Sequence, residues 1–536
     1  MILNKILSWN KLSLIGLTVI LLNNTSCIDL NDNINPNEVT EDMMSRDNLK
    51  TGSFFAQMLR NVVIFKDGSN IDSDYQIGQG MSGDIYSGYV SPTYAGYSGR
   101  HNGSYAFISG WLNMIFKTGF TNIMAPWKSI VEIADEQGLS EVRALATIVK
   151  VEAMHRIADT YGPIPYCSFG ASSNTYDGLD AIYQQFFDEL DESIEVLTDY
   201  VHGNANATIM ADYDLMYGGD ATKWVKFANT LRLRLAMRVY YANPTLAKEE
   251  AIKSVENSIG FISNKNERAE LQHSSSLIYH HPLYEIAYNF NDGEVRMSAS
   301  MDAYLNGYND PRRAVYFKPA GDGHYHGVRL GITPANMNSY KGSSISNLNM
   351  DNTTTPIVWM TAAESYFLRA EGALRGWSMG GTAEDFYNQG IRVSFEENGV
   401  TGVDNYISDT VSEPVAFEDA VSSDNISAPS NIKIAWDEGV EDEVNLERII
   451  TQKWIAMYPD GPEGWAEYRR TGYPKLFPVV VNNSNNTINT DLQIRRLPYP
   501  EDEYNNNASG VATGVAKLGG QDNGGTKLWW DKKVRN

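Results

Sequence analysis

Two kinds of short motif in this chain could support catalysis or metal binding. Residues 376–380, Gly-Trp-Ser-Met-Gly, match the Gly-x-Ser-x-Gly pattern of a nucleophile on a sharp turn between a strand and a helix. The residues before this motif have a helical pattern, so the serine lacks the strand that such a turn requires. Histidine occurs in close pairs at His280-His281 and at His324 and His326, but no third ligand follows at the spacing of a zinc site. We therefore predict no catalytic residue, no metal site and no cofactor.

Tyrosines interleaved with glycine and polar residues are better candidates for a ligand-binding surface. A sugar ring stacks its apolar face on a flat aromatic ring, while its hydroxyl groups form hydrogen bonds with polar side chains at the edge. Tyrosine offers a rigid contact area for such stacking. The competing interpretation is that these rings are half-buried packing residues. From residues 83–105 and 304–340 we predict six ligand-binding residues: Tyr89, Tyr94, Tyr97, Asn102, Tyr325 and Tyr340.

The N-terminus has the pattern of an export signal that ends in a lipid-attachment site. Residues 12–22 form a mostly apolar run of 11 residues, which is too short to span a bilayer as a helix. Cys27 follows this run as the expected acceptor of a lipid, which would hold the mature chain on a membrane surface. The competing interpretation is an ordinary cysteine near a cleavage site, because Asn24 stands where lipoprotein signals usually have leucine. We predict a signal peptide at residues 1–26 and an acidic tether at residues 27–40.

The overall composition excludes several classes of protein. The chain has 536 residues, of which 42% are hydrophobic and 20% charged, and this is typical of a globular protein with a large core. Its formal net charge of −23 disfavours binding to nucleic acid or to anionic lipid. No apolar run after the signal is long enough to span a membrane. If Cys27 carries a lipid, Cys167 has no partner for a disulfide bond, and we expect it to be a buried apolar residue.

Helical patterns dominate the rest of the chain and separate long irregular segments. Residues 139–159 are apolar almost all round, which is typical of a helix packed between neighbours. Residues 357–376 and 382–397 predict two paired helices near the length of a tetratricopeptide repeat, with small residues where they could touch. Further helices are predicted at residues 179–199, 221–238, 244–260 and 443–458. The long segments between helices are rich in glycine and aromatic residues and are expected to carry function: 66–110, 272–356 and 400–440.

Charged residues within the helical segments are expected to be structural. The pairs Arg232/Arg234 and Arg469/Arg470 are predicted to bind carboxylates and hold helices together, since bidentate arginine suits such networks. Asp159 precedes a Gly-Pro turn at the end of a helix, where a structural role explains it better than a catalytic one.

Four segments that follow one another along the chain resemble the SusD/RagB family of outer-membrane nutrient-binding lipoproteins. They are residues 158–166 (Ala-Asp-Thr-Tyr-Gly-Pro-Ile-Pro-Tyr), residues 224–234 (Trp-Val-Lys-Phe-Ala-Asn-Thr-Leu-Arg-Leu-Arg), residues 370–377 (Ala-Glu-Gly-Ala-Leu-Arg-Gly-Trp) with Tyr-Asn-Gln-Gly-Ile at 387–391, and residues 452–456 (Gln-Lys-Trp-Ile-Ala) with Trp-Ala-Glu-Tyr-Arg-Arg-Thr-Gly-Tyr-Pro at 465–474. Together with Arg-Leu-Pro-Tyr-Pro at 496–500, they cover nearly the whole mature chain.

The resemblance implies a mainly α-helical fold, in which tetratricopeptide-like helical pairs form a scaffold and long irregular loops with short strands carry the ligand surface. It implies one SusD-like domain at residues 41–536, a lipid on Cys27, and a place on the cell outer membrane, exposed at the surface. Asp29 and Asp32 look like the surface-export signal of such lipoproteins. Proteins of this family are not enzymes and are similar to lids that pass bound oligomers into a SusC-like, TonB-dependent transporter.

Three functions remain open from the sequence. The first is binding of oligosaccharides at the cell surface and their delivery to a SusC-like transporter. The second is binding of peptides by the same architecture, as the resemblance to RagB implies. The third is a surface glycoside hydrolase, which requires two carboxylates that face each other across a cleft. No nucleic acid is expected among the partners.

Overall fold

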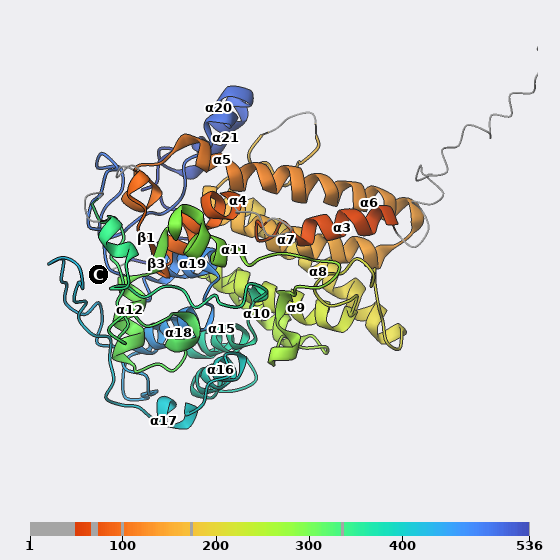
Figure 1. Cartoon of the computed structure of the whole chain (residues 1–536). Helices are drawn as coiled ribbons and strands as arrows, with labels where there is room; N and C mark the ends of the chain where they lie inside the picture. Colours follow the sequence, from red (N-terminus) through yellow and green to blue (C-terminus); the bar gives the residue numbers. More distant parts are fainter. Residues whose placement is uncertain (1–48, 66–72, 98–100, 172–174, 334–336, 535–536) are drawn as a thin grey trace, which may run out of the picture. The chain divides into compact units, whose positions relative to one another are not determined.

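The computed structural model describes residues 49–65, 73–97, 101–171, 175–333 and 337–534 (Figure 1). The predicted signal peptide, the tether and Cys27 lie outside these residues. The described residues after Leu49 belong to one compact unit that is built mainly of helices. None of the described helices combines the length and the apolar character that crossing a membrane requires.

Consecutive long helices pack against one another in the first part of the chain. Local signals fix where two of them begin, since the side chains of Asp220 and Asn243 accept hydrogen bonds from the backbone N–H groups of Lys223 and Leu246. The five helices, each in contact with the next, are α6 (Ala125–Gln137), α7 (Ser140–Tyr161), α8 (Leu179–Gly203), α9 (Ala221–Val239) and α10 (Pro244–Glu256). α7 is buried on nearly all sides, which confirms the prediction of a helix packed between neighbours.

A second group of helices follows later in the chain. Its members are α15 (Ala362–Leu374), α16 (Ala383–Glu397), α18 (Asp442–Ala456) and α19 (Gly461–Thr471), and α15 packs against both α16 and α18. A Cβ atom at Gly390 of α16 would come within 2.9 Å of the Phe367 ring of α15. The two helices therefore approach closely only because residue 390 is small, as the sequence predicts for this pair.

The remaining elements are short, and many lie in the segments that were expected to be irregular. In the described ranges, four strands form two antiparallel ribbons: β1 (Val90–Pro92) with β3 (Val295–Met297), and β2 (Ala269–Leu271) with β4 (Ile357–Met360). The shorter helical elements are α3 (Leu49–Leu59), α4 (Ser73–Tyr75), η2 (Gln76–Asp84), η3 (Ala95–Tyr97), η4 (Asn102–Ser104), α5 (Ser109–Thr118), η5 (Gly119–Met124), η6 (Lys265–Glu267), α11 (Pro282–Tyr284), η7 (Glu285–Asn289), η8 (Phe290–Asp292), α12 (Ala299–Gly307), α13 (Arg313–Tyr316), η9 (Asn338–Lys341), α17 (Val403–Ile407), α20 (Glu501–Asn506) and α21 (Ala508–Leu518).

The element η2 is a π-helix in a segment that the sequence predicts to be a loop with short strands. The glycines of η2 favoured an irregular backbone in the sequence analysis. In the structure they allow close packing with neighbouring elements. A Cβ atom at Gly83 would lie 2.7 Å from the Pro462 ring at the start of α19. Glycine here allows two backbones to approach each other, and the segment is helical and mostly buried.

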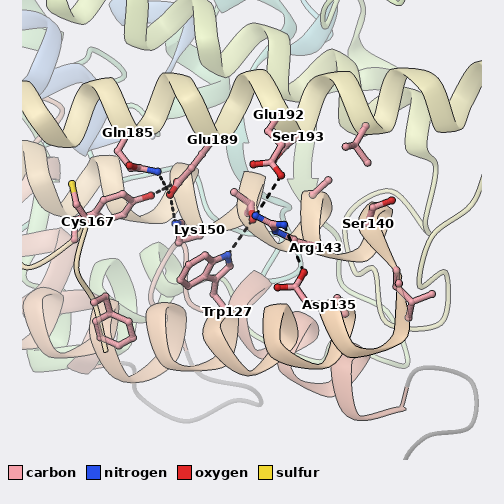
Figure 2. Close-up of a pocket in the computed structure, with 18 residues that line it drawn as sticks. Trp127, Asp135, Ser140, Arg143, Lys150, Cys167, Gln185, Glu189, Glu192 and Ser193 are labelled. Atoms are coloured by element: carbon pink, nitrogen blue, oxygen red, sulfur yellow. Dashed lines mark hydrogen bonds and ion pairs between the residues drawn. The ribbon is translucent and has the colours of Figure 1, made fainter. Parts of the chain in front are cut away.

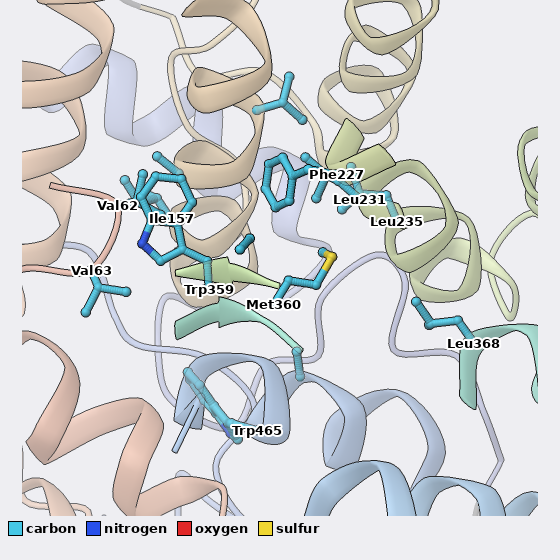
Figure 3. Packing of buried hydrophobic residues seen from close by; sticks show 14 of the residues in the cluster. Val62, Val63, Ile157, Phe227, Leu231, Leu235, Trp359, Met360, Leu368 and Trp465 are labelled. Carbon is cyan, nitrogen blue, oxygen red and sulfur yellow. The ribbon is translucent and has the colours of Figure 1, made fainter. Parts of the chain in front are cut away.

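The main hydrophobic cluster includes β4 and the helices around it (Figure 3). Trp359 and Met360 of β4 are buried there together with Phe227 of α9 and Trp465 of α19. Trp359 and Phe227 contact each other, with ring centroids 6.3 Å apart. Each such large apolar side chain contributes roughly 1.5–3 kcal/mol on burial, so this cluster is a main source of stability.

A network of buried charges connects the same helices. Arg234 of α9 donates hydrogen bonds of 2.9 and 2.7 Å to the Glu364 carboxylate of α15, and its guanidinium lies 3.4 Å from Glu152 of α7. Arg156 of α7 donates to Glu152 at 2.9 Å and to Asp460 at 2.8 Å. Burial alone would raise the pKa of Glu152, but the two arginines outweigh it and hold this pKa at about 2.

The other predicted arginines are also structural. Arg232 and Arg470 pair with carboxylates of neighbouring helices, as predicted. Arg469 instead donates a hydrogen bond to the backbone carbonyl of Asp159. The Asp159 carboxylate accepts a hydrogen bond of 2.7 Å from the indole of Trp530, so this aspartate links α7 to the C-terminal segment rather than facing a substrate.

Cys167 is exposed, which corrects the expectation of a buried apolar residue. The chain leaves α7 at Gly162 and comes to the surface before α8 begins. There the backbone N–H of Cys167 donates a hydrogen bond of 2.8 Å to Asp177. Partial burial of the sulfur, together with the nearby carboxylates of Asp177 and Glu189, raises the pKa of the thiol to about 12. The thiol therefore stays protonated at neutral pH and is a poor nucleophile.

Candidate functional site

The β1–β3 ribbon brings distant aromatic segments together. Its antiparallel register places Pro92 at the end of β1 opposite Val295 at the start of β3, so the chain that follows β1 lies beside the turn that precedes β3. The side chain of Arg296 in β3 in turn donates a hydrogen bond of 2.7 Å to the carbonyl of Lys341, which brings in η9. We call the surface that these three segments form the loop surface. It consists of residues 93–96 after β1, residues 291–294 before β3 and residues 338–341 of η9.

Tyr94 is half-buried on the loop surface, with a cation beside its ring. The Nζ atom of Lys341 lies 5.0 Å from the ring centroid, which is within range of a cation–π interaction. The same ammonium donates a hydrogen bond to the backbone carbonyl of Asn291, so it joins the tyrosine to the turn. A Cβ atom at Gly96 would come 2.3 Å from Cζ of Tyr94. Glycine therefore leaves the space that the ring occupies, and the ring has a defined position.

The turn at residues 291–293 adds polar groups to the loop surface. Asn291, Asp292 and Gly293 have φ angles of 50°, 58° and 77°, all in the left-handed region that is costly for residues other than glycine. The side-chain amide of Asn291 donates a hydrogen bond of 2.7 Å to Glu294. Asp292 is exposed. The turn thus presents an amide and a carboxylate near an aromatic ring, which is the combination that a sugar hydroxyl and a sugar face require.

Tyr340 supports the loop surface from below, because its ring is fully buried. Its hydroxyl donates a hydrogen bond of 2.6 Å to Asp419 and lies 3.1 Å from the Ser422 hydroxyl, so it links η9 to the segment after α17. The ring packs in a second hydrophobic cluster with Val328, against which Ala95 also packs. Burial, followed by the bond to Asp419, raises the pKa of Tyr340. Tyr340 therefore positions Lys341 and holds the segment of Tyr94 in place.

Tyr325 is half-buried beside α12 and α13. The guanidinium carbon of Arg313 lies 4.4 Å from its ring centroid, and the Asn306 side chain donates a hydrogen bond of 2.9 Å to its carbonyl. Asn306 also donates to Asp302, whose pKa burial raises to about 6. Tyr325 therefore has an aromatic ring with polar neighbours, as Tyr94 does.

Tyr89 and Asn102 are buried and do not reach the surface, which corrects their prediction as ligand contacts. The Tyr89 ring stacks on Trp454 at 5.3 Å, and its hydroxyl donates a hydrogen bond of 2.6 Å to the carbonyl of the same residue. The Asn102 amide donates a hydrogen bond of 2.8 Å to the carbonyl of Met81. Both side chains hold the loops in place. The backbone of Tyr97 lies in η3, but its side chain is outside the described part of the chain.

Lys341 and the Asn291–Gly293 turn were not predicted from the sequence as parts of the site. A signal existed for the turn, because Asn-Asp-Gly is a typical turn sequence. Lys341 directly follows the predicted Tyr340, and a cation next to an aromatic residue is a second local signal. Neither signal reveals that the two lie beside Tyr94, because that depends on the pairing of β1 with β3.

The Gly-x-Ser-x-Gly segment and the histidine pair at residues 280 and 281 take part in local contacts. Gly376, with a φ of 73°, ends α15, so Ser378 lies in the connection between two helices and not after a strand. His280 lies 3.0 Å from Glu285, while His281 accepts a hydrogen bond from the N–H of Leu283. In the part of the chain that the structure describes, no group of three or more His, Cys, Asp or Glu side chains is arranged to hold a metal ion.

Comparisons with known proteins agree with this architecture. A family model described as SusD-like, "Susd and RagB outer membrane lipoprotein", matches residues 29–531. No curated protein sequence matches the chain significantly. A chitin-binding SusD homologue from Flavobacterium johnsoniae is 40% identical, with a TM-score of 0.84 over 90% of this chain and 98% of that chain. SusD homologues from Bacteroides uniformis (37% identity, TM-score 0.84, 90% and 99% coverage) and Bacteroides vulgatus (35%, 0.85, 91% and 99%) are also similar.

Proposed function

Because the chain belongs to the SusD-like family of outer membrane lipoproteins, we propose that it binds oligosaccharides at the cell surface and delivers them to a SusC-like, TonB-dependent outer-membrane transporter. The protein is a binding protein and not an enzyme, as SusD-like proteins are. The mechanism that we propose is capture of an oligosaccharide without chemical change, followed by its transfer into the transporter.

The observation that carries this proposal is the arrangement around Tyr94. Its half-buried ring offers an apolar face, and Lys341 and the Asn291–Gly293 turn lie beside it with a cation, an amide and a carboxylate. These groups match the apolar face and the hydroxyl rim of a sugar. The chitin-binding homologue from Flavobacterium johnsoniae supports a glycan rather than a peptide as the ligand class.

The six predicted residues divide into two groups in this proposal. Residues whose rings can face a ligand are proposed as contacts, and buried residues are assigned to support of the loops. The contacts are Tyr94 and Tyr325, and the supports are Tyr89, Asn102 and Tyr340. Tyr97, whose side chain lies outside the described part of the chain, stays a proposed contact on its sequence alone.

We further propose that residues 1–26 are removed as a signal peptide and that Cys27 becomes the lipid-modified N-terminus. Residues 27–40 then act as a tether between the membrane and one binding domain at residues 41–536. The family description as an outer membrane lipoprotein supports this arrangement. Mass spectrometry of the mature protein tests it, since a chain that begins at Cys27 without added acyl mass would contradict the proposal.

The ligand class is tested with an array of glycans, including chitin oligosaccharides, and of peptides. Bound compounds are then measured by calorimetry with wild type, Tyr94→Ala and Tyr504→Ala. Tyr504 is an exposed tyrosine on α20 that is outside the loop surface, so it controls for the general effect of losing a surface tyrosine. Loss of one stacking ring is expected to weaken binding by about 2 kcal/mol, or roughly thirtyfold, while Tyr504→Ala binds like wild type.

Two results would contradict the proposal in different ways. Binding of peptides with no binding of glycans would show that the ligand class is wrong. Glycan binding that is equally strong in Tyr94→Ala and in wild type would show that the loop surface is not the site.

A further inference from the structure

A cavity of about 420 Å³ lies on the helical scaffold and shares no residue with the loop surface. It is a groove between α6 and α8, with α7 as its floor (Figure 2). Ser140 lies toward one end of the groove and Cys167 toward the other. Its volume is within the range of about 300–1,000 Å³ that is typical of small-molecule sites. We call it the α6–α8 groove.

Trp127 of α6 is the main aromatic residue of the α6–α8 groove. Its indole N–H donates a hydrogen bond of 3.1 Å to the Thr147 hydroxyl of α7, which fixes the plane of the ring. The ammonium of Lys150 lies 3.7 Å from the ring centroid of Trp127 and 4.6 Å from that of Tyr166. The lysine thus fills the space between two rings and holds both of them in position at the bottom of the groove.

Lys150 is satisfied inside the protein and does not need a charged ligand. Its side chain is 1% exposed, and its ammonium donates a hydrogen bond of 2.6 Å to Glu189 of α8. Gln185 donates a further hydrogen bond of 3.2 Å to the same carboxylate, and the Tyr166 hydroxyl donates one of 2.5 Å. Glu189 is therefore ordered by three neighbours while its side chain remains 13% exposed.

The rim of the groove carries charges that nearly cancel. Arg143 of α7 lies 3.6 Å from Asp135 of α6 and 3.3 Å from Glu192 of α8, so it connects the two walls. With Lys150 and Glu189, the lining has two cations and three carboxylates. A groove of this kind gives no strong attraction to an anion or a cation, but it offers many hydrogen-bond donors and acceptors beside an aromatic ring. Cys167 at its end is a protonated thiol, so covalent capture is not expected.

We propose that the α6–α8 groove is a second carbohydrate site, which binds one neutral sugar ring independently of the loop surface. The sugar ring stacks against the side of the Trp127 indole that the Lys150 ammonium does not occupy, and its hydroxyl groups form hydrogen bonds with Arg143, Glu189 and Glu192. The single excess carboxylate disfavours a uronic acid, and the three carboxylates already pair with Arg143 and Lys150, so the ammonium of an amino sugar gains little over a neutral hydroxyl group. This inference goes beyond the proposed delivery function, because it concerns residues that the loop surface does not include and holds whether or not the loop surface binds a glycan.

Calorimetry with single sugars tests the second site. The probes are glucose, galactose and N-acetylglucosamine, with glucuronate, glucosamine and a short capped peptide as counter-probes. At least one neutral sugar is expected to bind wild type and Tyr94→Ala equally, while Trp127→Ala weakens that binding about tenfold. Trp436→Ala is the matched control, because Trp436 is also half-buried and also donates through its indole to one side chain, Glu438, but lies outside the groove.

A second variant keeps the test valid if Trp127→Ala does not fold. Glu192→Gln changes a side chain that is 61% exposed, so the fold is expected to tolerate it, and it is expected to weaken sugar binding about fivefold because a charged acceptor becomes neutral. A crystal soaked with the bound sugar should show the ring in the groove. The proposal is overturned if no neutral sugar binds, if the peptide or a charged probe binds instead, if Tyr94→Ala abolishes the binding, or if both groove variants bind like wild type.

Discussion

Replacing Arg234 with methionine tests whether the buried charges hold the scaffold together. The side chain is fully buried and donates two hydrogen bonds to Glu364 and one of 3.1 Å to the carbonyl of Trp359. Methionine fills most of its volume but leaves Glu364 with Lys453, at 3.4 Å, as its nearest remaining cation. Breaking a buried pair usually costs about 3–5 kcal/mol, and this partial compensation favours a value of about 3 kcal/mol.

The assay is urea denaturation followed by tryptophan fluorescence, with the slope of the transition compared between variants. Arg392→Met is the matched control, because Arg392 pairs with Asp404 at the surface, where the side chains are 43% and 81% exposed. Its loss is expected to change the free energy of unfolding by less than about 1 kcal/mol. The double variant Arg234→Met with Glu364→Gln should regain about 1–2 kcal/mol over Arg234→Met, since it removes the buried carboxylate that has lost its main partner.

Two results would refute this reasoning. The first is an Arg234→Met protein that is as stable as the Arg392→Met control, which would mean that the pair contributes nothing. The second is a double variant that is less stable than Arg234→Met, which would mean that Glu364 is not destabilised by the loss of its partner.

Three further predictions concern single residues. Gly96→Ala should weaken glycan binding about tenfold, because the new Cβ atom displaces the ring of Tyr94 from its position. The free energy of unfolding should change by less than about 1 kcal/mol, because the Cβ atom meets only this one side chain. Unchanged binding in calorimetry would contradict this prediction. Burial, opposed by hydrogen bonds from Tyr75 and Gln79, raises the pKa of Asp84 to about 7, so the folded state holds a proton that the unfolded state releases near pH 4. The difference in unfolding free energy between wild type and Asp84→Asn should therefore move against wild type by up to about 4 kcal/mol from pH 4 to 7, and a constant difference would argue against it. Gly390→Val should lower the melting temperature, since the new side chain collides with the Phe367 ring; an unchanged melting curve would show that α15 and α16 can separate freely.

The helices could be predicted from the sequence because their signals are local. Asp220 and Asn243 are good N-cap residues, and both accept the hydrogen bond expected of them. The apolar surface of residues 139–159 likewise indicated a helix enclosed by others. The partners of its charged residues were not predictable in the same way. Glu152 and Arg156 resemble an ordinary solvent-exposed i, i+4 pair, but further partners come from α9 and from Asp460, some 300 residues away.

The candidate site shows the same limit. Tyr89 and Tyr94 are five residues apart in a stretch rich in glycine, and nothing local distinguishes them. Tyr89 precedes β1 and packs on Trp454, while Tyr94 follows β1 and lies beside Lys341. Which of them is buried depends on contacts with residues that are hundreds of positions away. Composition therefore selects the segment as a candidate, but only the tertiary structure separates the half-buried ring from the buried one.

The position of the β1–β3 ribbon has a consequence for the order of folding. The hydroxyl of Ser91 in β1 donates a hydrogen bond to the carbonyl of Val328, 237 positions along the chain, whereas the helices of the first group contact their immediate successors. Closing so long a loop carries a large entropic cost before any contact compensates for it, so such contacts form slowly. During refolding, helical ellipticity should return well before ligand binding, because the ligand surface is complete only after the most distant segments have met.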